Sequence, residues 1–325
     1  MRILLTTTSF QDTPGPHHDL LAATGWEIVR ARGPLTEADT LSLVGDIDGY
    51  ICGDDAITRR VLIKSQPRLK VLSKYGIGID KVDVAAATEL GIPFLFTPGV
   101  NHTTVAEHTF LLLLSLEKNL LFHTDSTRGG GWKRKTGHEL FNKTLGIVGF
   151  GRVGREVAVR ARAFGMNVVG LGRSWDDVFA HEHQIKRAAS LPELCGISDY
   201  ITLHISLNEE TRGLINARSI AGMKKGVIIV NCARGEVVNT ADLVAALKSG
   251  HVAGYGTDVL DQEPPPAEHP LLHLPNVVVT PHIGSRTYES VARQAMMAAQ
   301  NLIQALNGEK PHAQINPEVP IRKAT

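Results

Sequence analysis

Three polar residues in the second half of the 325-residue sequence have side chains that could together reduce a carbonyl group. Arg234 lies in "VNCARGEVV", Glu263 in "DVLDQEPPP" and His282 in "TPHIGS". A carbonyl that accepts a hydride needs a proton donor, and histidine is the common choice. A neighbouring carboxylate can hold the imidazole, and an arginine fork can bind a substrate carboxylate. In the oxidising direction, His282 would instead take the hydroxyl proton.

Each of these residues taken alone has a simpler explanation. A single histidine near a sheet is more often structural, Arg234 could form an interdomain salt bridge, and Glu263 could be a surface acid. All three, however, follow expected strands, and ligands of open α/β sheets bind beyond the carboxyl ends of strands. Their joint occurrence after a glycine-rich nucleotide motif favours the catalytic interpretation.

The nucleotide motif is the stretch "GFGRVG", which matches the GxGxxG pattern. Gly149 would make the tight turn, Gly151 would let the backbone approach a pyrophosphate, and Gly154 would let helix and strand pack closely. Arg152 and Val153 would open the helix, whose N-terminal N–H groups would face the phosphates. The motif follows an apolar strand and opens an apolar helix, as this mechanism requires. The alternative is a glycine-rich turn without a ligand.

The acid that binds the ribose 2′-OH in NAD sites is missing from the end of the second strand of this unit. Gly172 stands at that position and has no side chain, and Arg173 and Ser174 follow it. A carboxylate would repel a 2′-phosphate, whereas an arginine can bind one through two hydrogen bonds. These residues therefore favour NADP(H), with NAD(H) possible. The alternative is a surface arginine that stacks on adenine without selectivity.

Short β-rich runs alternate with helical stretches along the chain, which predicts parallel sheets with crossover helices. The expected strands of the first third are residues 2–7, 27–31, 48–52, 70–75 and 92–96, with helices in 33–44 and 80–91. A new alternation begins near residue 144. Its expected strands are residues 144–150, 167–171, 199–205, 226–232, 252–260 and 276–280, with helices at 152–165 and 241–250.

Two long helices are expected where the chain passes between these two alternations, at residues 101–121 and 286–307. The second is apolar at helical spacing, and we expect it to pack back onto the N-terminal unit. The domains would then be discontinuous. Residues 1–98 plus 288–325 would form one α/β domain, and residues 99–287 would be inserted as the nucleotide-binding domain.

Composition and charge exclude several classes of protein. The sequence is 43% hydrophobic and has a formal net charge of +1, so it predicts neither a nucleic-acid nor a membrane partner. The apolar run 110–116 is too short to span a bilayer and is expected to be one buried helix. Cys52, Cys195 and Cys232 show no disulfide or zinc spacing, so no metal site is expected. Because the N-terminus is too polar for a signal peptide, we expect a cytoplasmic protein.

Four motifs in order, "GIVGFGRVG", "NCARGEVV", "DVLDQEP" and "TPHIGS", resemble the D-isomer-specific 2-hydroxyacid dehydrogenases. That family includes phosphoglycerate dehydrogenases and glyoxylate/hydroxypyruvate reductases. "KYGIGIDKVD" and "TPGVNHTTVAEH" resemble its substrate loop and interdomain helix, so the likeness runs nearly end to end. It implies two doubly wound parallel-sheet domains, a flavodoxin-like substrate domain and an inserted Rossmann dinucleotide-binding domain.

The resemblance also implies roles for individual residues. Arg234 would bind the carboxylate of a small 2-keto or 2-hydroxy acid, Glu263 would be the partner acid, and His282 would be the acid/base. The implied substrate loop is Lys74, Tyr75, Gly76, Ile77 and Gly78. Further implied cofactor contacts are His204, Ile205, Ser206, Thr211, Cys232, Ala233, Asp258 (to the nicotinamide amide) and Gly284. Family members are dimeric through the inserted domain, so a homodimer is expected, with the "GGGW" loop in its arm.

Some positions depart from the family pattern and leave alternatives open. Gly172 replaces the Asp of NAD-using members, and "GRS" resembles the NADP-using glyoxylate/hydroxypyruvate reductases. Ile205 and Ser206 stand where a proline-containing pair is common. The chain length leaves no room for the regulatory domain of long phosphoglycerate dehydrogenases, although 3-phosphoglycerate dehydrogenase activity remains an alternative. Lys74 could bind a second anion of the substrate, or could be an exposed lysine.

Two other functions share the fold that the resemblance implies. The formate-oxidising branch of the family has glutamine at the position of Glu263, which disfavours that activity. A non-catalytic NAD(P)-sensing protein, similar to the corepressors built on this fold, keeps the same Arg, Glu and His residues. The motifs do not separate a sensor from an enzyme. A peptide-binding extension would favour the sensor, and the sequence shows none.

Overall fold

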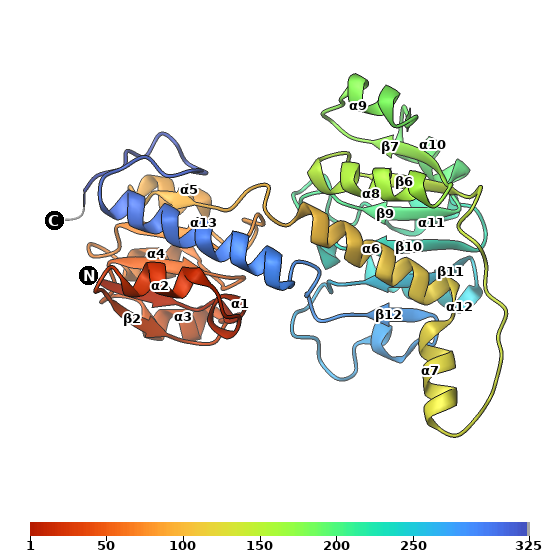
Figure 1. Ribbon diagram of the computed structural model, residues 1–325, viewed down its shortest axis with the longest axis horizontal. Helices are drawn as coiled ribbons and strands as arrows, with labels where there is room; N and C mark the ends of the chain where they lie inside the picture. The colour runs from red at the N-terminus through yellow and green to blue at the C-terminus, as the bar shows by residue number, and fades with distance from the viewer. Residues whose placement is uncertain (324–325) are drawn as a thin grey trace. The chain divides into compact units, whose positions relative to one another are not determined.

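The computed structural model describes residues 1–323 and divides the chain into two α/β units (Figure 1). The first unit is Met1–Asn101 with Arg286–Thr325, and the second is His102–Ser285. These boundaries lie within three residues of those expected from the sequence. Each unit has a single parallel sheet, and the predicted fold class is confirmed.

The first unit has a five-stranded sheet in the order β2-β1-β3-β4-β5. Its strands are β1 (Arg2–Leu5), β2 (Glu27–Arg30), β3 (Gly49–Cys52), β4 (Val71–Lys74) and β5 (Phe94–Leu95). All neighbouring strands are parallel, with Ile3 opposite both Ile28 and Gly49. This is the flavodoxin-like order, whose topological switch point lies between the first and third strands.

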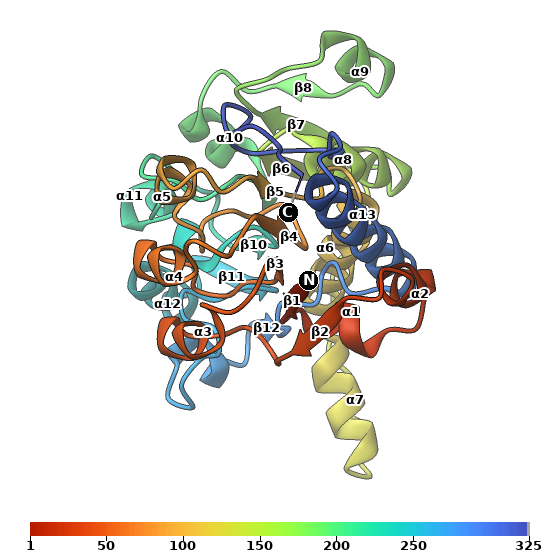
Figure 2. The same cartoon turned by 90° about the vertical axis from the view of Figure 1, so that its left-hand side faces the viewer.

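Helices cover both faces of this sheet (Figure 2). They are α1 (Thr8–Asp12), α2 (Pro16–Ala22), α3 (Glu37–Leu43), α4 (Arg59–Lys64), α5 (Val84–Glu89) and α13 (Tyr288–Leu306). Side chains of α3, α4 and α5 form one core cluster, and α13 with α1 and α2 forms the other. In α13, Ala295, Ala298 and Ala299 are fully buried, and Ala298 O accepts a 2.9 Å hydrogen bond from Ser73 Oγ. The helix after residue 286 therefore packs onto the N-terminal unit.

The second unit has a seven-stranded parallel sheet in the order β12-β11-β10-β9-β6-β7-β8. Its strands are β6 (Thr144–Val148), β7 (Asn167–Leu171), β8 (Lys186–Arg187), β9 (Tyr200–Leu203), β10 (Val227–Asn231), β11 (Val252–Thr257) and β12 (Val277–Val279). This is the doubly wound Rossmann order with one added edge strand, and its switch point lies between β6 and β9. The buried faces of β9 and β10 explain their unbroken apolar sequences.

Two layers of helices enclose the second sheet (Figure 1). The helices of this unit are α6 (His102–Glu117), α7 (Leu120–Arg128), α8 (Arg152–Ala163), α9 (Asp177–Glu182), α10 (Leu191–Ile197), α11 (Ala217–Ala221), α12 (Thr240–Ser249), and the 3-10 helices η1 (Gly235–Val237) and η2 (Pro270–His273). Of these, α7 extends away from the sheet (Figure 1). α6 and α8 pack on one face, whereas α10, α11 and α12 pack on the other. Neither this unit nor the rest of residues 1–323 has a helix with the length and hydrophobicity needed to cross a membrane.

The single helix expected over residues 101–121 is wrong in one respect. Asn119 adopts a left-handed conformation with φ 50°, which ends α6 and starts α7 in a new direction. The apolar pattern continues through this break, so the sequence hides it. The run 110–116 lies in α6 and is not wholly buried, because the side chain of Leu111 is 51% exposed.

Candidate active site

The carboxyl ends of β10, β11 and β12 meet at one edge of the second sheet and carry the three candidate catalytic residues. Arg234 follows β10, Glu263 follows β11 and His282 follows β12. His282 adopts a left-handed conformation with φ 52°, an uncommon state for a residue with a side chain. Its backbone N–H donates to Asp258 O at 2.9 Å, which holds the turn against the end of β11.

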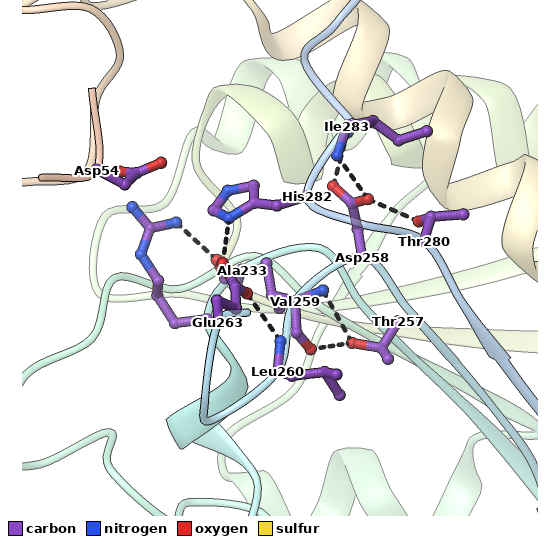
Figure 3. Close-up of polar contacts among 12 residues, drawn as sticks. Asp54, Ala233, Thr257, Asp258, Val259, Leu260, Glu263, Thr280, His282 and Ile283 are labelled. Carbon is purple, nitrogen blue, oxygen red and sulfur yellow. Dashed lines mark hydrogen bonds and ion pairs between the residues drawn. The ribbon is translucent and has the colours of Figure 1, made fainter. Parts of the chain in front are cut away.

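His282 and Glu263 form a direct pair, as Figure 3 shows. His282 Nδ1 lies 2.8 Å from Glu263 Oε2. The other carboxylate oxygen, Oε1, accepts the backbone N–H of Leu260 at 2.8 Å. The His282 and Glu263 side chains are 31% and 32% exposed, so both reach solvent. Glu263 is thus fixed at both oxygens, and one ring nitrogen of His282 is committed to it.

The turn that carries Arg234 is held by Asn231, which is fully buried at the end of β10. Asn231 Oδ1 accepts the N–H of Ala233 at 2.9 Å, and its Nδ2 donates to Arg234 O at 2.9 Å. Arg234 Nη1 in turn donates to Ala233 O at 2.8 Å. These contacts fix the backbone from which the guanidinium extends.

Asp258 holds the turn after β12 in place through hydrogen bonds. Its carboxylate accepts hydrogen bonds from Thr280 Oγ1 at 2.6 Å, Ile283 N at 2.9 Å and Gly284 N at 2.6 Å (Figure 3). His108 Nε2 lies 3.3 Å from the same carboxylate. Burial alone would raise the pKa of Asp258, but the hydrogen bonds from His108, Thr280 and Ile283 outweigh it and lower the pKa. Asp258 therefore stays ionised and accepts the hydrogen bonds that hold this turn. Its contact with a nicotinamide amide stays a prediction.

The glycine-rich turn has the shape that a dinucleotide needs. Gly149 has φ 102°, and a Cβ there would lie 2.4 Å from the carbonyl oxygen of His204 across the switch point. A Cβ on Gly154 would lie 2.1 Å from Gly149 O, so helix and turn are in close contact. A Cβ on Gly151, by contrast, would meet no heavy atom of the described chain within 4 Å. Gly151 is the N-cap of α8, so the open space lies at a helix N-terminus, where a phosphate binds well.

Gly172, which follows β7 at the position of the expected acid, is closely packed. A Cβ on Gly172 would lie 2.9 Å from Phe150 Cβ and 3.1 Å from Phe150 N. The ring of Trp175 stacks on Phe150 with centroids 4.5 Å apart. Arg173 and Ser174, between these packed residues, are both exposed. A side chain at position 172 would therefore require Phe150 to shift, and the turn presents the cation of Arg173 and the hydroxyl of Ser174.

The other predicted cofactor residues follow β9 and β10. Both ring nitrogens of His204 are covered and lack a hydrogen-bond partner within residues 1–323, although the residue as a whole is only half-buried. Burial of the ring lowers the pKa of His204 to about 3. Thr211 Oγ1 donates to Ser206 O at 2.8 Å, which closes the loop after β9. Burial raises the pKa of the Cys232 thiol to about 12, so this residue stays neutral.

The predicted substrate loop belongs to the first unit. Gly76 has φ 125°, and its N–H donates to Thr97 Oγ1 at 2.8 Å. Tyr75 is buried, whereas Ile77 is 41% exposed. Lys74, treated from the sequence as possibly an exposed lysine, is in fact 1% exposed, and that alternative is wrong. Its ammonium lies 2.8 Å from Asp54 Oδ1 and donates to Gly53 O, so a carboxylate of this chain already compensates its charge.

Several residues that shape the site were not predicted from the sequence. Asn231, His108 and Thr280 position the turns at the ends of β10 and β12. Asn231 carried one readable signal, since it is a polar residue that ends an apolar strand. His108 carried none, because it reaches Thr280 from a helix 172 residues away in the sequence.

Comparison with known proteins agrees with this geometry. Residues 110–284 match the NAD binding domain of the D-isomer specific 2-hydroxyacid dehydrogenases. A D-3-phosphoglycerate dehydrogenase of Methanocaldococcus jannaschii is 38% identical over 300 residues, which are 91% of this chain and 57% of that protein. A glyoxylate reductase of Thermofilum pendens is 39% identical over 295 residues, 88% of this chain and 86% of that protein. The crystal structure of a glyoxylate reductase from Paecilomyes thermophila is 31% identical and covers 98% of each chain with a TM-score of 0.85.

The chain therefore belongs to the D-isomer specific 2-hydroxyacid dehydrogenase family. It is an oxidoreductase that acts on the CH–OH group of 2-hydroxy acids, or on the matching 2-keto group, with a nicotinamide dinucleotide. The resemblance read from the four sequence motifs is confirmed.

Proposed function

We propose that this protein reduces small 2-keto acids with NADPH, and that glyoxylate and hydroxypyruvate are its first candidate substrates. His282 donates the proton, Glu263 holds the imidazole and Arg234 binds the substrate carboxylate. The single observation that carries this proposal is the 2.8 Å contact between His282 Nδ1 and Glu263 Oε2. It supports an acid/base role because the pair lies at the carboxyl ends of the strands, where ligands of such sheets bind.

The proposed chemistry divides among these residues. A bound reduced nicotinamide supplies the hydride to the carbonyl carbon. Because Nδ1 of His282 is committed to Glu263, Nε2 is the nitrogen that gives its proton to the carbonyl oxygen. The Glu263 carboxylate, fixed by Leu260 N–H, stabilises the protonated imidazole. The planar fork of Arg234 orients the substrate through its carboxylate.

A substrate panel tests the activity. Initial rates with NADPH should be highest on glyoxylate and hydroxypyruvate and should be lost when the 2-keto acid is replaced by the matching aldehyde without a carboxylate. A higher kcat/KM on 3-phosphohydroxypyruvate would instead assign the 3-phosphoglycerate dehydrogenase activity named for one relative. No turnover on the whole panel, with cofactor binding intact, would favour the non-catalytic sensor.

The preference for NADPH is supported by the end of β7. Arg173 and Ser174 are exposed there, and Phe150 packs closely against Gly172, which has no side chain. The nearby acid Asp176 is already paired with Arg155 at 2.8 Å, so its charge is compensated. Competition by 2′,5′-ADP and by 5′-ADP against bound NADPH tests this preference. The 2′-phosphorylated compound should bind more tightly, and equal affinities would contradict the proposal.

We also propose that the protein is a cytoplasmic homodimer. Support comes from large apolar side chains that are exposed on the second unit between residues 111 and 141. They are Leu111, Leu120, Leu121, Phe122, Trp132 and Phe141, each 43–75% exposed. Leu120, Leu121 and Phe122 are consecutive on α7, which has no buried residue, and an exposed apolar run of this kind is typical of an interaction surface. Sedimentation equilibrium should give twice the mass of one chain, and Leu121→Glu should shift the protein towards monomer. A wild-type mass of one chain would contradict the proposal.

A further inference from the structure

The loop from Leu260 to His269 carries Glu263 and contains three consecutive prolines. Glu263 holds its place through the N–H of Leu260 and through His282. Such a loop has little regular structure of its own, since η2 begins only at Pro270. Its position must therefore come from side chains that tie it to neighbouring elements.

Asp261 supplies these ties from a point two residues before Glu263. One carboxylate oxygen lies 2.8 Å from His269 Nε2 at the far end of the loop. The other accepts a 2.8 Å hydrogen bond from Thr240 Oγ1 at the start of α12. Burial alone would raise the pKa of Asp261, but the hydrogen bonds from His269 and Thr240 lower it, so the carboxylate stays ionised. The loop is thus closed on itself and fastened to a helix.

His269 is suited to be an anchor rather than a reagent. Its side chain is 6% exposed, whereas that of His282 is 31% exposed. Its backbone N–H donates to Pro266 O at 3.0 Å, so both main chain and side chain of His269 close the loop. Asp261 also lines an open surface pocket whose other charged side chains are Arg212 and Glu236.

The base of the loop rests directly on the turn that carries Arg234. A Cβ on Gly235 would lie 2.0 Å from the carbonyl carbon of Leu260 and 2.2 Å from Asp261 N. Two backbones can approach this closely only because Gly235 has no side chain. The loop that holds Glu263 therefore packs, backbone against backbone, on the turn that carries Arg234. Asp261 lies at the point of contact.

We propose that Asp261 and His269 form a brace that positions Glu263 against His282, and that both are positioning residues for proton transfer. This inference rests on the proposed roles of Glu263 and His282. Loss of the brace lets the Glu263 carboxylate move away from Nδ1, which weakens its stabilisation of the protonated ring. Errors of about 1 Å in such placements can cost about 100-fold in rate.

The test compares His269→Ala with His269→Gln, which keeps a side-chain N–H that can reach Asp261. The readouts are kcat, the KM for the 2-keto acid, and the pH at which kcat/KM for reduction falls to half on the alkaline side. We expect His269→Ala to lower kcat about 10-fold with little change in KM and to move the alkaline midpoint to lower pH. His269→Gln should restore part of both changes. A purely structural histidine would lower the melting temperature of the folded enzyme and leave the midpoint unchanged, which would overturn the inference.

Combination with Glu263→Gln shows whether the brace acts through Glu263. In that background His269→Ala should add no further shift of the midpoint, and a fully additive shift would overturn the inference. If His269→Ala does not fold, Thr240→Val replaces it, because this change removes one hydrogen bond to Asp261. It should move the alkaline midpoint in the same direction by a smaller amount. An unchanged midpoint in Thr240→Val would again overturn the inference. If Glu263→Gln itself changes neither kcat nor the midpoint, the proposed function of Glu263 fails and the brace with it. A normal His269→Ala beside an impaired Glu263→Gln overturns the brace alone.

Discussion

Two regions at the carboxyl edge of the second sheet are built in different ways. At the ends of β10, β11 and β12, each catalytic turn is held by buried polar side chains or by direct contact between backbones, as at Asn231, Asp258 and Gly235. At the end of β7, Arg173 and Ser174 are exposed. The difference indicates which part can change. The residues proposed for catalysis lie on the turns after β10, β11 and β12, which we call the braced edge. The residues proposed to select the nucleotide lie on the accessible turn after β7.

The largest expected effect is on the braced edge, from removal of the proton donor. His282→Ala should lower kcat for glyoxylate reduction by about 100-fold to 10,000-fold, the usual contribution of general acid catalysis. Steady-state kinetics with saturating NADPH measures the change. His312→Ala, an exposed histidine of the first unit, is the matched control and should leave kcat unchanged. Near-normal turnover in His282→Ala would refute the acid/base assignment.

A pair of glycine substitutions sharpens the comparison between braced and open sites. In Gly235→Ala the new Cβ would collide with the Leu260–Asp261 backbone, so we expect kcat to fall by about 10-fold to 100-fold. In Gly151→Ala the Cβ meets no described atom of the chain, so the melting temperature of the cofactor-free protein should hold while the KM for NADPH rises. Gly196→Ala, whose Cβ would make an ordinary 3.8 Å contact, is the control for both. If Gly235→Ala and Gly151→Ala lower kcat equally, the distinction between the braced catalytic turns and the open nucleotide site is wrong.

Substitution at the nucleotide turn should alter cofactor choice and little else. Arg173→Ala should reduce the ratio of kcat/KM for NADPH to that for NADH by about 10-fold to 100-fold, since a charge-assisted hydrogen bond contributes about 1.5–3 kcal/mol. The kcat with saturating cofactor should stay close to that of the wild type. Arg218→Ala, an exposed arginine on α11, is the matched control. An unchanged ratio in Arg173→Ala would remove this residue from nucleotide recognition.

The last effect, from His204, is on stability and not on catalysis. The pKa of this residue falls from its usual 6.5 to about 3 in the folded chain, because burial disfavours the charged ring. The unfolded chain therefore binds a proton below pH 6.5 that the folded chain does not, and stability is lost as pH falls from 6.5 towards 3. The loss is about 1.4 kcal/mol per pH unit, or about 2 kcal/mol at pH 5.

Urea unfolding of the cofactor-free protein at pH 7 and pH 5 measures this term. His204→Gln should lose less unfolding free energy than the wild type over that interval. His312→Gln, at an exposed position, should behave as the wild type does. If wild type and His204→Gln respond equally to pH, the ring is not held neutral in the folded protein.

The sequence predicted the sheets well because buried parallel strands have distinctive apolar runs. "GVIIVNC" contains all of β10, and the expected closing helix contains α13. Short helices such as α2, α4 and α10 are not predictable from the sequence, because six or seven residues are too few to show a helical period. The bend at Asn119 was also missed, since the apolar pattern of α6 continues into α7.

The candidate site was predictable to a similar depth. Motif spacing located Arg234, Glu263 and His282, because polar residues that follow apolar strands are visible in the sequence. Most of the contacts that hold these residues are not visible in the sequence. His108 reaches Thr280, and Asp261 reaches Thr240, only after the chain has folded. Gly172 illustrates the same limit, since its departure from the family pattern was readable but the contact with Phe150 that explains it was not.

The cofactor preference of the wild-type enzyme tests most directly whether the turn after β7 selects the nucleotide. The measurement is kcat/KM for NADPH and for NADH with glyoxylate held at saturation. We predict a ratio above one, because Gly172 stands where an acid would repel the 2′-phosphate, and the exposed Arg173 and Ser174 follow it. A ratio below one would contradict the proposed preference for NADPH.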